Sequence, residues 1–319
     1  MKIYRRFCWC CCALALCAAE FVSPAGAQET VGSAPIELRR NMPVAEVMID
    51  GLGPFHFAID TGSGGEAAVS GELIEKLVLP VIGQEDVGDP SGTNQQKVDV
   101  VQIESLNFAG VQFKDVRAIR LVEMGPGPGR NVDGILGFLL FRDYLLSIDF
   151  PGERVTLLKG SLPAADGEQI LPFRMPNNVP VIELSIGGKA MDAHVDTGGM
   201  GLSLPDKIAG GLAFVSEPVV IGHGRTISHE FDLKGAQLIS QIRVGGYTFP
   251  KPFVEINPLF PIVNFGAIPL RNFVVTFDQK NKLVRFVAAE KSIQLKAPRT
   301  MGGPPRAEMP VQPGSVAPR

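Results

Sequence analysis

Cysteine and tryptophan are scarce in this sequence and confined to its first residues. Among the 319 residues there are 5 cysteines and 1 tryptophan, and all of them lie between positions 8 and 17. They are Cys8, Trp9, Cys10, Cys11, Cys12 and Cys17. A chain that loses this stretch has no disulfide, no thiol nucleophile and no cysteine-based metal site.

The first 27 residues have the composition of a secretory signal peptide. A basic start is followed by an apolar run over residues 7–19 and by small residues at 25–27. The apolar run is too short to span a bilayer comfortably. We therefore expect cleavage after Ala27 and an exported protein, periplasmic or secreted. An uncleaved anchor, or a lipid attached to Cys17, stays open as an alternative.

The sequence has neither a large charge of one sign nor a second long apolar run. Its formal net charge is −3 at pH 7, and 20% of its residues are charged. A mildly acidic chain has no electrostatic reason to bind nucleic acid, so we expect no such partner. We also expect no stable membrane insertion once the signal is removed. With 45% apolar residues, the length is sufficient for two lobes with cores of their own.

A short motif occurs twice in the chain. The first copy is Asp60-Thr61-Gly62-Ser63 and the second is Asp196-Thr197-Gly198-Gly199, and each follows an apolar stretch that has the pattern of a strand. Glycine permits a tight turn and the close approach of another segment. One such tripeptide usually marks a plain junction between a strand and a turn. Two copies within a longer repeat predict two carboxylates that meet across an internal two-fold axis.

The repeat extends well beyond the aspartates. The strand pattern of residues 42–49 returns at 179–186, and Ile135-Leu136-Gly137 returns as Asn264-Phe265-Gly266. A predicted hairpin over 146–157 returns at 275–286. Short helices are expected near 72–79 and 138–144. A duplicated lobe with insertions in its loops explains this pattern.

The repeat also sets the expected domain boundaries. We predict an N-terminal lobe over 33–158, a linker over 159–167 and a C-terminal lobe over 168–290. Residues 28–35 are expected to form a loose leader, because they show no clear apolar period. Residues 291–319 are expected to form a disordered tail rich in proline and glycine.

These motifs resemble the aspartic protease superfamily, and more closely the short-lobed retropepsin-like proteins of bacteria than vertebrate pepsins. The resemblance implies an all-β fold with two closed-barrel lobes, a pseudo-two-fold axis and a few short helices. It implies a cleft between the lobes with a hairpin flap above it, although no tyrosine between Asp60 and Asp133 can serve as a flap tyrosine. Each lobe would supply one catalytic aspartate, Asp60 or Asp196, and Thr61 and Thr197 would tie the two loops together.

The chemistry of such a pair explains why it needs two carboxyl groups. Two carboxylates a few ångströms apart repel one another, so one of them keeps a proton. The ionised partner takes a proton from water while the protonated one donates to the scissile carbonyl. The resemblance therefore implies an aspartic endopeptidase that acts on peptides or proteins without a metal or a cofactor. Because one chain carries both halves, we expect a monomer. The sequence does not assign the shared proton.

Two residues depart from the family pattern, and both lie in the second lobe. Gly199 has no side chain with which to hold its aspartate, whereas Ser63 has a hydroxyl, and Asn264 replaces an apolar residue. We therefore expect Asp196 to be held less firmly. A catalytically weak or inactive peptide-binding protein is the alternative. The residues expected to support the aspartates are Thr61, Gly62, Ser63, Thr197, Gly198 and Gly199.

The histidines were weighed as bases and metal ligands. His194 is the most interesting, because it lies two residues before Asp196 on the same face of a strand. A solvated or structural role is still favoured for it over catalysis. His223 and His229 are expected to flank a second flap, as ordinary loop residues. Without cysteine, and with no close His and carboxylate spacing, we expect no metal site.

Overall fold

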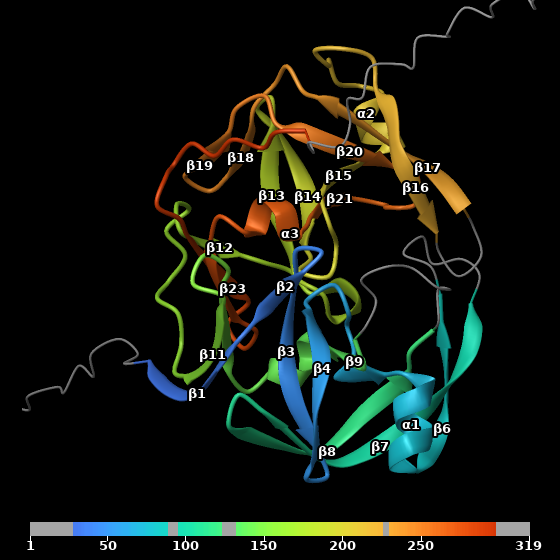
Figure 1. Cartoon of the computed structure of the whole chain (residues 1–319). Helices are drawn as coiled ribbons and strands as arrows, with labels where there is room; N and C mark the ends of the chain where they lie inside the picture. Colours follow the sequence, from blue (N-terminus) through green and yellow to red (C-terminus); the bar gives the residue numbers. More distant parts are fainter. Residues whose placement is uncertain (1–27, 89–94, 123–131, 226–229, 298–319) are drawn as a thin grey trace, which may run out of the picture.

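A computed structural model describes residues 28–88, 95–122, 132–225 and 230–297 of the chain. The predicted signal peptide, residues 1–27, lies outside the described residues. The structure is mostly β, with three sheets and a few short helices, and one lobe lies above the other with a shared sheet alongside both (Figure 1). The predicted all-β, bilobal fold is confirmed.

The first lobe is built on an eight-stranded sheet in the order β2-β3-β4-β9-β5-β8-β7-β6. Its apolar strands form hairpins. A short helix begins after Ser70, because the Ser70 hydroxyl caps it by accepting a hydrogen bond from the backbone N–H of Leu73. The elements are β2 (Glu37–Arg39), β3 (Met42–Ile49), β4 (Leu52–Asp60), β5 (Ala67–Val69), α1 (Gly71–Leu77), β6 (Val81–Val87), β7 (Gln96–Phe108), β8 (Val111–Arg120), β9 (Gly134–Gly137) and the 3-10 helix η1 (Phe138–Phe141).

The second lobe repeats this plan on a nine-stranded sheet in the order β16-β17-β20-β15-β21-β14-β13-β18-β19. The β13–β14 hairpin corresponds to β3–β4, and β21 lies beside β14 as β9 lies beside β4. The elements are η2 (Pro176–Asn178), β13 (Val181–Ile186), β14 (Lys189–Val195), β15 (Leu202–Pro205), α2 (Asp206–Ala209), β16 (Val219–Arg225), β17 (Glu230–Gln237), β18 (Ile242–Val244), β19 (Tyr247–Phe249), β20 (Phe253–Asn257), β21 (Val263–Phe265) and α3 (Ala267–Leu270).

A six-stranded sheet joins the two lobes, in the order β1-β11-β10-β22-β23-β12. Its strands are β1 (Glu29–Pro35), β10 (Leu145–Asp149), β11 (Arg154–Lys159), β12 (Ile170–Pro172), β22 (Val274–Asp278) and β23 (Leu283–Val287). The predicted hairpins of the two copies, β10–β11 and β22–β23, meet antiparallel at its centre. There the Ser147 and Thr276 hydroxyls are 2.9 Å apart. The repeat axis therefore passes between β10 and β22.

Aromatic side chains continue the core from one half of the chain into the other. Phe138 at the start of η1 packs edge-on against Phe277 of β22, with ring centroids 5.2 Å apart. It also contacts Phe173, at 6.1 Å between centroids. Because both partners belong to the second half of the sequence, burial of these rings fixes the lobes against each other.

The structure corrects two expectations about the ends of the lobes. Residues 28–35 do not form a loose leader, because β1 pairs with β11 from Glu29 to Pro35. The predicted disordered tail does not begin at residue 291 either. Ser292 pairs with Thr248, and the side chains of Ile293 and Leu295 are buried. The division of the chain at a linker over 159–167 stays a prediction. Among the described residues, no helix is both long and apolar enough to cross a membrane.

Candidate functional site

The two Asp-Thr-Gly loops follow corresponding strands of the two lobes. Asp60 is the last residue of β4, and Asp196 comes directly after β14. In each lobe a parallel strand lies alongside and continues into a short helix that holds the loop. The backbone N–H of Phe138 donates to the carbonyl of Ser63 at 2.8 Å, and that of Ala267 donates to the carbonyl of Gly199 at 2.7 Å. Each loop is therefore fixed by its own lobe before it meets the other.

The two threonines interlock the loops, as the resemblance implied. The Thr61 hydroxyl donates to the carbonyl of Val195 at 2.6 Å, and the Thr197 hydroxyl donates to the carbonyl of Ile59 at 2.7 Å. Each hydroxyl also accepts from the backbone N–H of the other threonine, at 3.0 and 3.1 Å. Both side chains are fully buried. This symmetric network brings the two strand ends together across the axis of the repeat.

The central glycines allow each aspartate to lie against the opposite loop. A Cβ atom placed on Gly62 would be 2.5 Å from Oδ1 of Asp196, and one placed on Gly198 would be 2.3 Å from Cγ of Asp60. Real Cβ contacts are not this short, so a side chain at either position would push the carboxyl group away. Glycine is required here for close approach.

Asp60 is in an environment that favours its protonated form. Its half-buried carboxyl group lies close to that of Asp196, and it accepts a hydrogen bond from the backbone N–H of Gly62 at 2.8 Å. Burial is the largest cause and the charge of Asp196 the second; together they raise the pKa of Asp60 from its ordinary 3.8 to about 8. The backbone N–H groups of Gly62 and Ser63 act in the opposite direction but do not offset these effects.

Asp196 is surrounded by hydrogen-bond donors. Its Oδ1 accepts from the backbone N–H groups of Gly198 at 2.9 Å and Gly199 at 2.8 Å. Its Oδ2 accepts from the side-chain amide of Asn264 at 2.9 Å. The expectation that Gly199 and Asn264 leave Asp196 loosely held was therefore wrong, because both residues bind it. Donors of this kind stabilise an ionised carboxylate.

The predicted supporting residues thus lie together, with one difference of detail. Thr61, Gly62, Thr197, Gly198 and Gly199 all contact the aspartates or the opposite loop, as described above. Ser63 acts on Asp60 through its backbone N–H. In the described part of the chain, its hydroxyl has no hydrogen bond to that carboxylate.

Of the histidines weighed from the sequence, only His194 lies beside the aspartates. It is half-buried, and its Nε2 atom is enclosed without a hydrogen-bond partner among the described residues. Burial lowers the pKa of His194, and the charge of Asp196 partly opposes this effect. His223 is exposed on β16 and lies 2.8 Å from Asp232. His229 lies outside the described residues.

Two further polar residues of the second lobe, Ser203 and Glu255, make a contact that the sequence does not predict. The Ser203 hydroxyl donates to Oε2 of Glu255 at 2.7 Å. Burial raises the pKa of Glu255, whereas the Ser203 hydrogen bond lowers it. A Cβ atom placed on Gly201, in the loop that follows Asp196, would lie 2.3 Å from the Glu255 carboxyl carbon. The signal for this contact is the alignment of the two repeats, in which Glu255 takes the place of Ile119.

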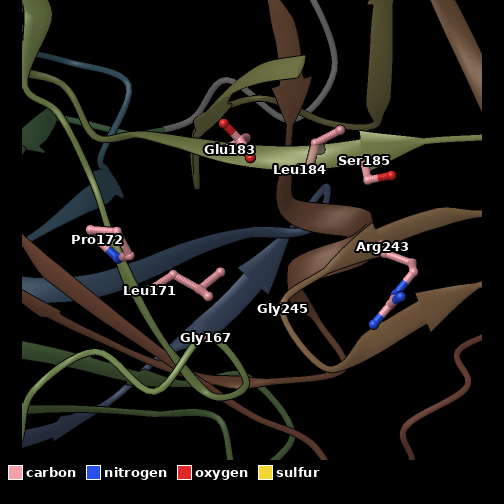
Figure 2. A pocket seen from close by; sticks show the side chains of 8 residues that line it. All are labelled: Gly167, Leu171, Pro172, Glu183, Leu184, Ser185, Arg243 and Gly245. Atoms are coloured by element: carbon pink, nitrogen blue, oxygen red, sulfur yellow. The ribbon is translucent and has the colours of Figure 1, made fainter. Parts of the chain in front are cut away.

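A pocket elsewhere in the second lobe shares no residue with the aspartate loops. It has a volume of about 380 Å³. Figure 2 shows Glu183, Leu184 and Ser185 along β13, with Arg243 on the neighbouring strand. The remaining lining residues are Gly167, Leu171, Pro172 and Gly245. Within the described ranges, no group of three or more His, Cys, Asp or Glu side chains is placed to hold a metal ion.

Comparison with known proteins is in line with this geometry. A family model described as aspartyl protease matches residues 45–139. The matched segment runs from β3 into η1 and contains the first Asp-Thr-Gly loop, but it ends before Asp196. No curated protein matches the chain. The match supports an aspartic protease family and, with it, a hydrolase function of the aspartic type.

Proposed function

We propose that this protein is an aspartic endopeptidase in which Asp60 and Asp196 act as one catalytic pair. The observation that carries the proposal is the interlocked pair of Asp-Thr-Gly loops. Four hydrogen bonds through Thr61 and Thr197 hold the loops face to face, and the two carboxyl groups lie in contact. The aspartyl protease match to the first lobe supports the same class of activity.

The different surroundings of the two aspartates support distinct starting roles. Asp60 begins protonated, since its raised pKa of about 8 keeps the proton at neutral and acidic pH. Asp196 takes the role of the base, since three N–H groups donate to its oxygens. A general acid and a general base then face the same substrate bond.

In the first step, the Asp196 carboxylate takes a proton from a water molecule while the water oxygen forms a bond to the scissile carbonyl carbon. Asp60 gives its proton to the carbonyl oxygen, so the tetrahedral intermediate carries two hydroxyl groups and no net charge. In the second step the C–N bond breaks. Asp196 returns its proton to the leaving nitrogen, and Asp60 recovers a proton from one hydroxyl as the new carboxylic acid forms.

The alternative, an inactive protein that only binds peptides, is less well supported. It rested on Gly199 and Asn264, the two departures from the family pattern. Since both residues donate hydrogen bonds to Asp196, they give no reason to expect a weakened aspartate. We further propose that the protein is exported after cleavage at Ala27 and acts as a monomer on peptide or protein substrates.

The test is digestion of a complex peptide library by the purified protein, over a range of acidic to neutral pH, followed by mass spectrometry. We expect new peptide termini with the wild-type protein and none with the double variant Asp60→Asn/Asp196→Asn. The amide is nearly isosteric with the carboxyl group, so the variant is a matched control for the fold. Equal cleavage by both proteins, or none by the wild type at any pH, would contradict the proposal.

A further inference from the structure

The surroundings of the two aspartates differ at two corresponding positions of the repeat. The residue three places after the aspartate is Ser63 in the first lobe and Gly199 in the second. The parallel strand beside the aspartate carries Ile135 in the first lobe and Asn264 in the second. A side chain able to donate is thus present once in each lobe, but on a different segment.

Asn264 makes a direct and buried contact with Asp196. Its side chain is 2% exposed, and its Nδ2 atom donates to Oδ2 of Asp196 at 2.9 Å. An ionised carboxylate has only acceptors, so the amide nitrogen is the atom that must face it. The other carboxylate oxygen, Oδ1, is taken by the backbone N–H groups of Gly198 and Gly199. Asn264 therefore supplies a buried side-chain donor to the second oxygen.

Gly199 leaves the space that Asn264 uses. A Cβ atom at position 199 would lie 2.3 Å from the Asn264 amide nitrogen and 2.5 Å from Oδ2 of Asp196. Any larger residue at position 199 would displace the amide, the carboxylate or both. Position 199 can therefore carry a hydroxyl side chain, or position 264 can carry an amide that reaches Asp196, but not both.

We propose that Asn264 is a positioning residue that holds Asp196 as the base through its side-chain amide, and that Gly199 is matched to it because glycine leaves the space that the amide occupies. The inference rests on the proposed function and adds to it the residue that fixes which aspartate is the base. In the first lobe, Ile135 has no polar atom at the corresponding position. Asp60 lacks this donor, in agreement with the direction of its raised pKa.

The experiment compares three variants that give the second lobe the residues of the first lobe at positions 199 and 264. Asn264→Ile gives the second lobe the residue that the first lobe carries. Gly199→Ser introduces the hydroxyl, and the double variant reproduces the Ser63 and Ile135 combination. For each protein, the pH dependence of kcat/KM is measured on a peptide that the wild type cleaves. Carboxyl groups are titrated in parallel by ¹³C NMR, with the Asp196 signal assigned from its loss in Asp196→Asn.

Asn264→Ile should move the acid limb of the pH profile to higher pH by about 1 to 2 units, because one hydrogen bond to the ionised form is lost. Its kcat/KM below the optimum should fall about ten- to hundredfold. Gly199→Ser alone should also lose activity, through the clash. The double variant should stay shifted like Asn264→Ile, because a Cβ at position 199 also lies 2.5 Å from Oδ2 of Asp196 and the Ser63 hydroxyl makes no hydrogen bond to Asp60 among the described residues of the first lobe. If Asn264→Ile does not fold, Asn264→Leu takes its place, because leucine is close to asparagine in shape and has no donor; the shift should be in the same direction.

Asn257→Ile is the matched control, because Asn257 is a second buried asparagine of the same lobe and bonds to the backbone N–H of Leu259 instead. It should lower stability without moving the acid limb. An unmoved acid limb and Asp196 signal in Asn264→Ile would overturn the positioning role. A Gly199→Ser protein with the activity and acid limb of the wild type would overturn the matching of Gly199 to Asn264. If the wild type cleaves no peptide, the proposed function fails, and the NMR titration still decides the role of Asn264.

Discussion

The two lobes share a backbone plan but differ in the row of side chains that crosses each sheet beside its aspartate loop. In the first lobe, neighbouring strands place four apolar residues at paired positions, namely Ala58, Ile135, Ala68 and Ile119. In the second lobe, the corresponding strands place four polar residues there, namely His194, Asn264, Ser203 and Glu255. Side chains at paired positions lie on the same face of a sheet, so each row is continuous.

This difference teaches how a duplicated scaffold can give two equal carboxyl groups unequal roles. The threonine network is the same in both lobes, which fixes the distance between the aspartates. The surroundings of the two carboxyl groups then differ. Burial and the charge of Asp196 raise the pKa of Asp60, whereas Asn264 of the polar row donates a hydrogen bond to Asp196. The comparison predicts that substitutions of Thr61 and Thr197 have equal effects, whereas substitutions in the row beside each aspartate loop have different effects in the two lobes.

The largest expected effect comes from the aspartates themselves. Asp60→Asn and Asp196→Asn should each lower kcat/KM by at least about a thousandfold, because the pair acts as one unit. For the same reason the double variant should lose no more than either single variant. Hydrolysis rates of the three proteins, with circular dichroism to verify the fold, provide the measurement. Near-normal turnover by Asp196→Asn would show that the second lobe is only a scaffold.

Removal of either threonine hydroxyl should cost stability equally in the two lobes. Thr61→Val and Thr197→Val each leave a buried carbonyl and a buried N–H without a partner, so each should lower the free energy of unfolding by about 1–3 kcal/mol. Both should also reduce activity, because the loops separate. Urea unfolding with parallel assays measures this. Thr276→Val is the control, since Thr276 is equally buried and joins the halves through Ser147. It should lose stability but keep activity, and unequal losses for Thr61 and Thr197 would break the symmetry.

A pH effect on stability should come from Asp60. Its pKa is raised from 3.8 to about 8, so the native protein keeps a proton that the unfolded chain releases. The stability that this proton provides is fully present below about pH 4 and is lost as pH rises towards about 8. Asp60→Asn should remove this part of the decline. Chemical unfolding at a series of pH values is the measurement, and an identical decline in both proteins would contradict the assignment of the proton.

The smallest expected effect comes from the far end of the polar row. Burial raises the pKa of Glu255, so its ionised form costs the native protein stability above the ordinary pKa of a glutamate. Glu255→Gln keeps the shape and should raise the free energy of unfolding at neutral pH by about 0.5 kcal/mol. The gain should disappear in acid. A loss of stability at neutral pH would show that the charge of Glu255 is stabilising.

Much of the fold and the candidate site could be predicted because the sequence contains an internal repeat, whose two copies can be compared with each other. The repeat of Asp-Thr-Gly, of the glycine-ended strand and of the hairpin marks the residues that meet at the axis. By contrast, β1 could not be predicted, because Glu29–Pro35 has no apolar alternation and is held by backbone pairing to β11. The buried Ile293 and Leu295 were missed because only a folded lobe offers them a surface.

The role of Asn264 depends on contacts that no local pattern shows. Its hydrogen bond to Asp196 exists because β21 lies parallel to β14, with His194 opposite Asn264. In isolation an asparagine in an apolar motif indicates a defect. Only the distance from its amide to the carboxylate, together with the space left by Gly199, shows that it holds Asp196.

The central claim is that both carboxyl groups of one catalytic pair come from a single chain. It is tested most directly by the hydrolysis rate of a mixture of Asp60→Asn and Asp196→Asn proteins, each inactive alone, over a wide range of concentration. A pair built within one chain predicts that the mixture stays inactive at every concentration, while the wild type keeps the same specific activity on dilution. Activity restored by mixing would contradict the account, because it would require a pair assembled from two chains.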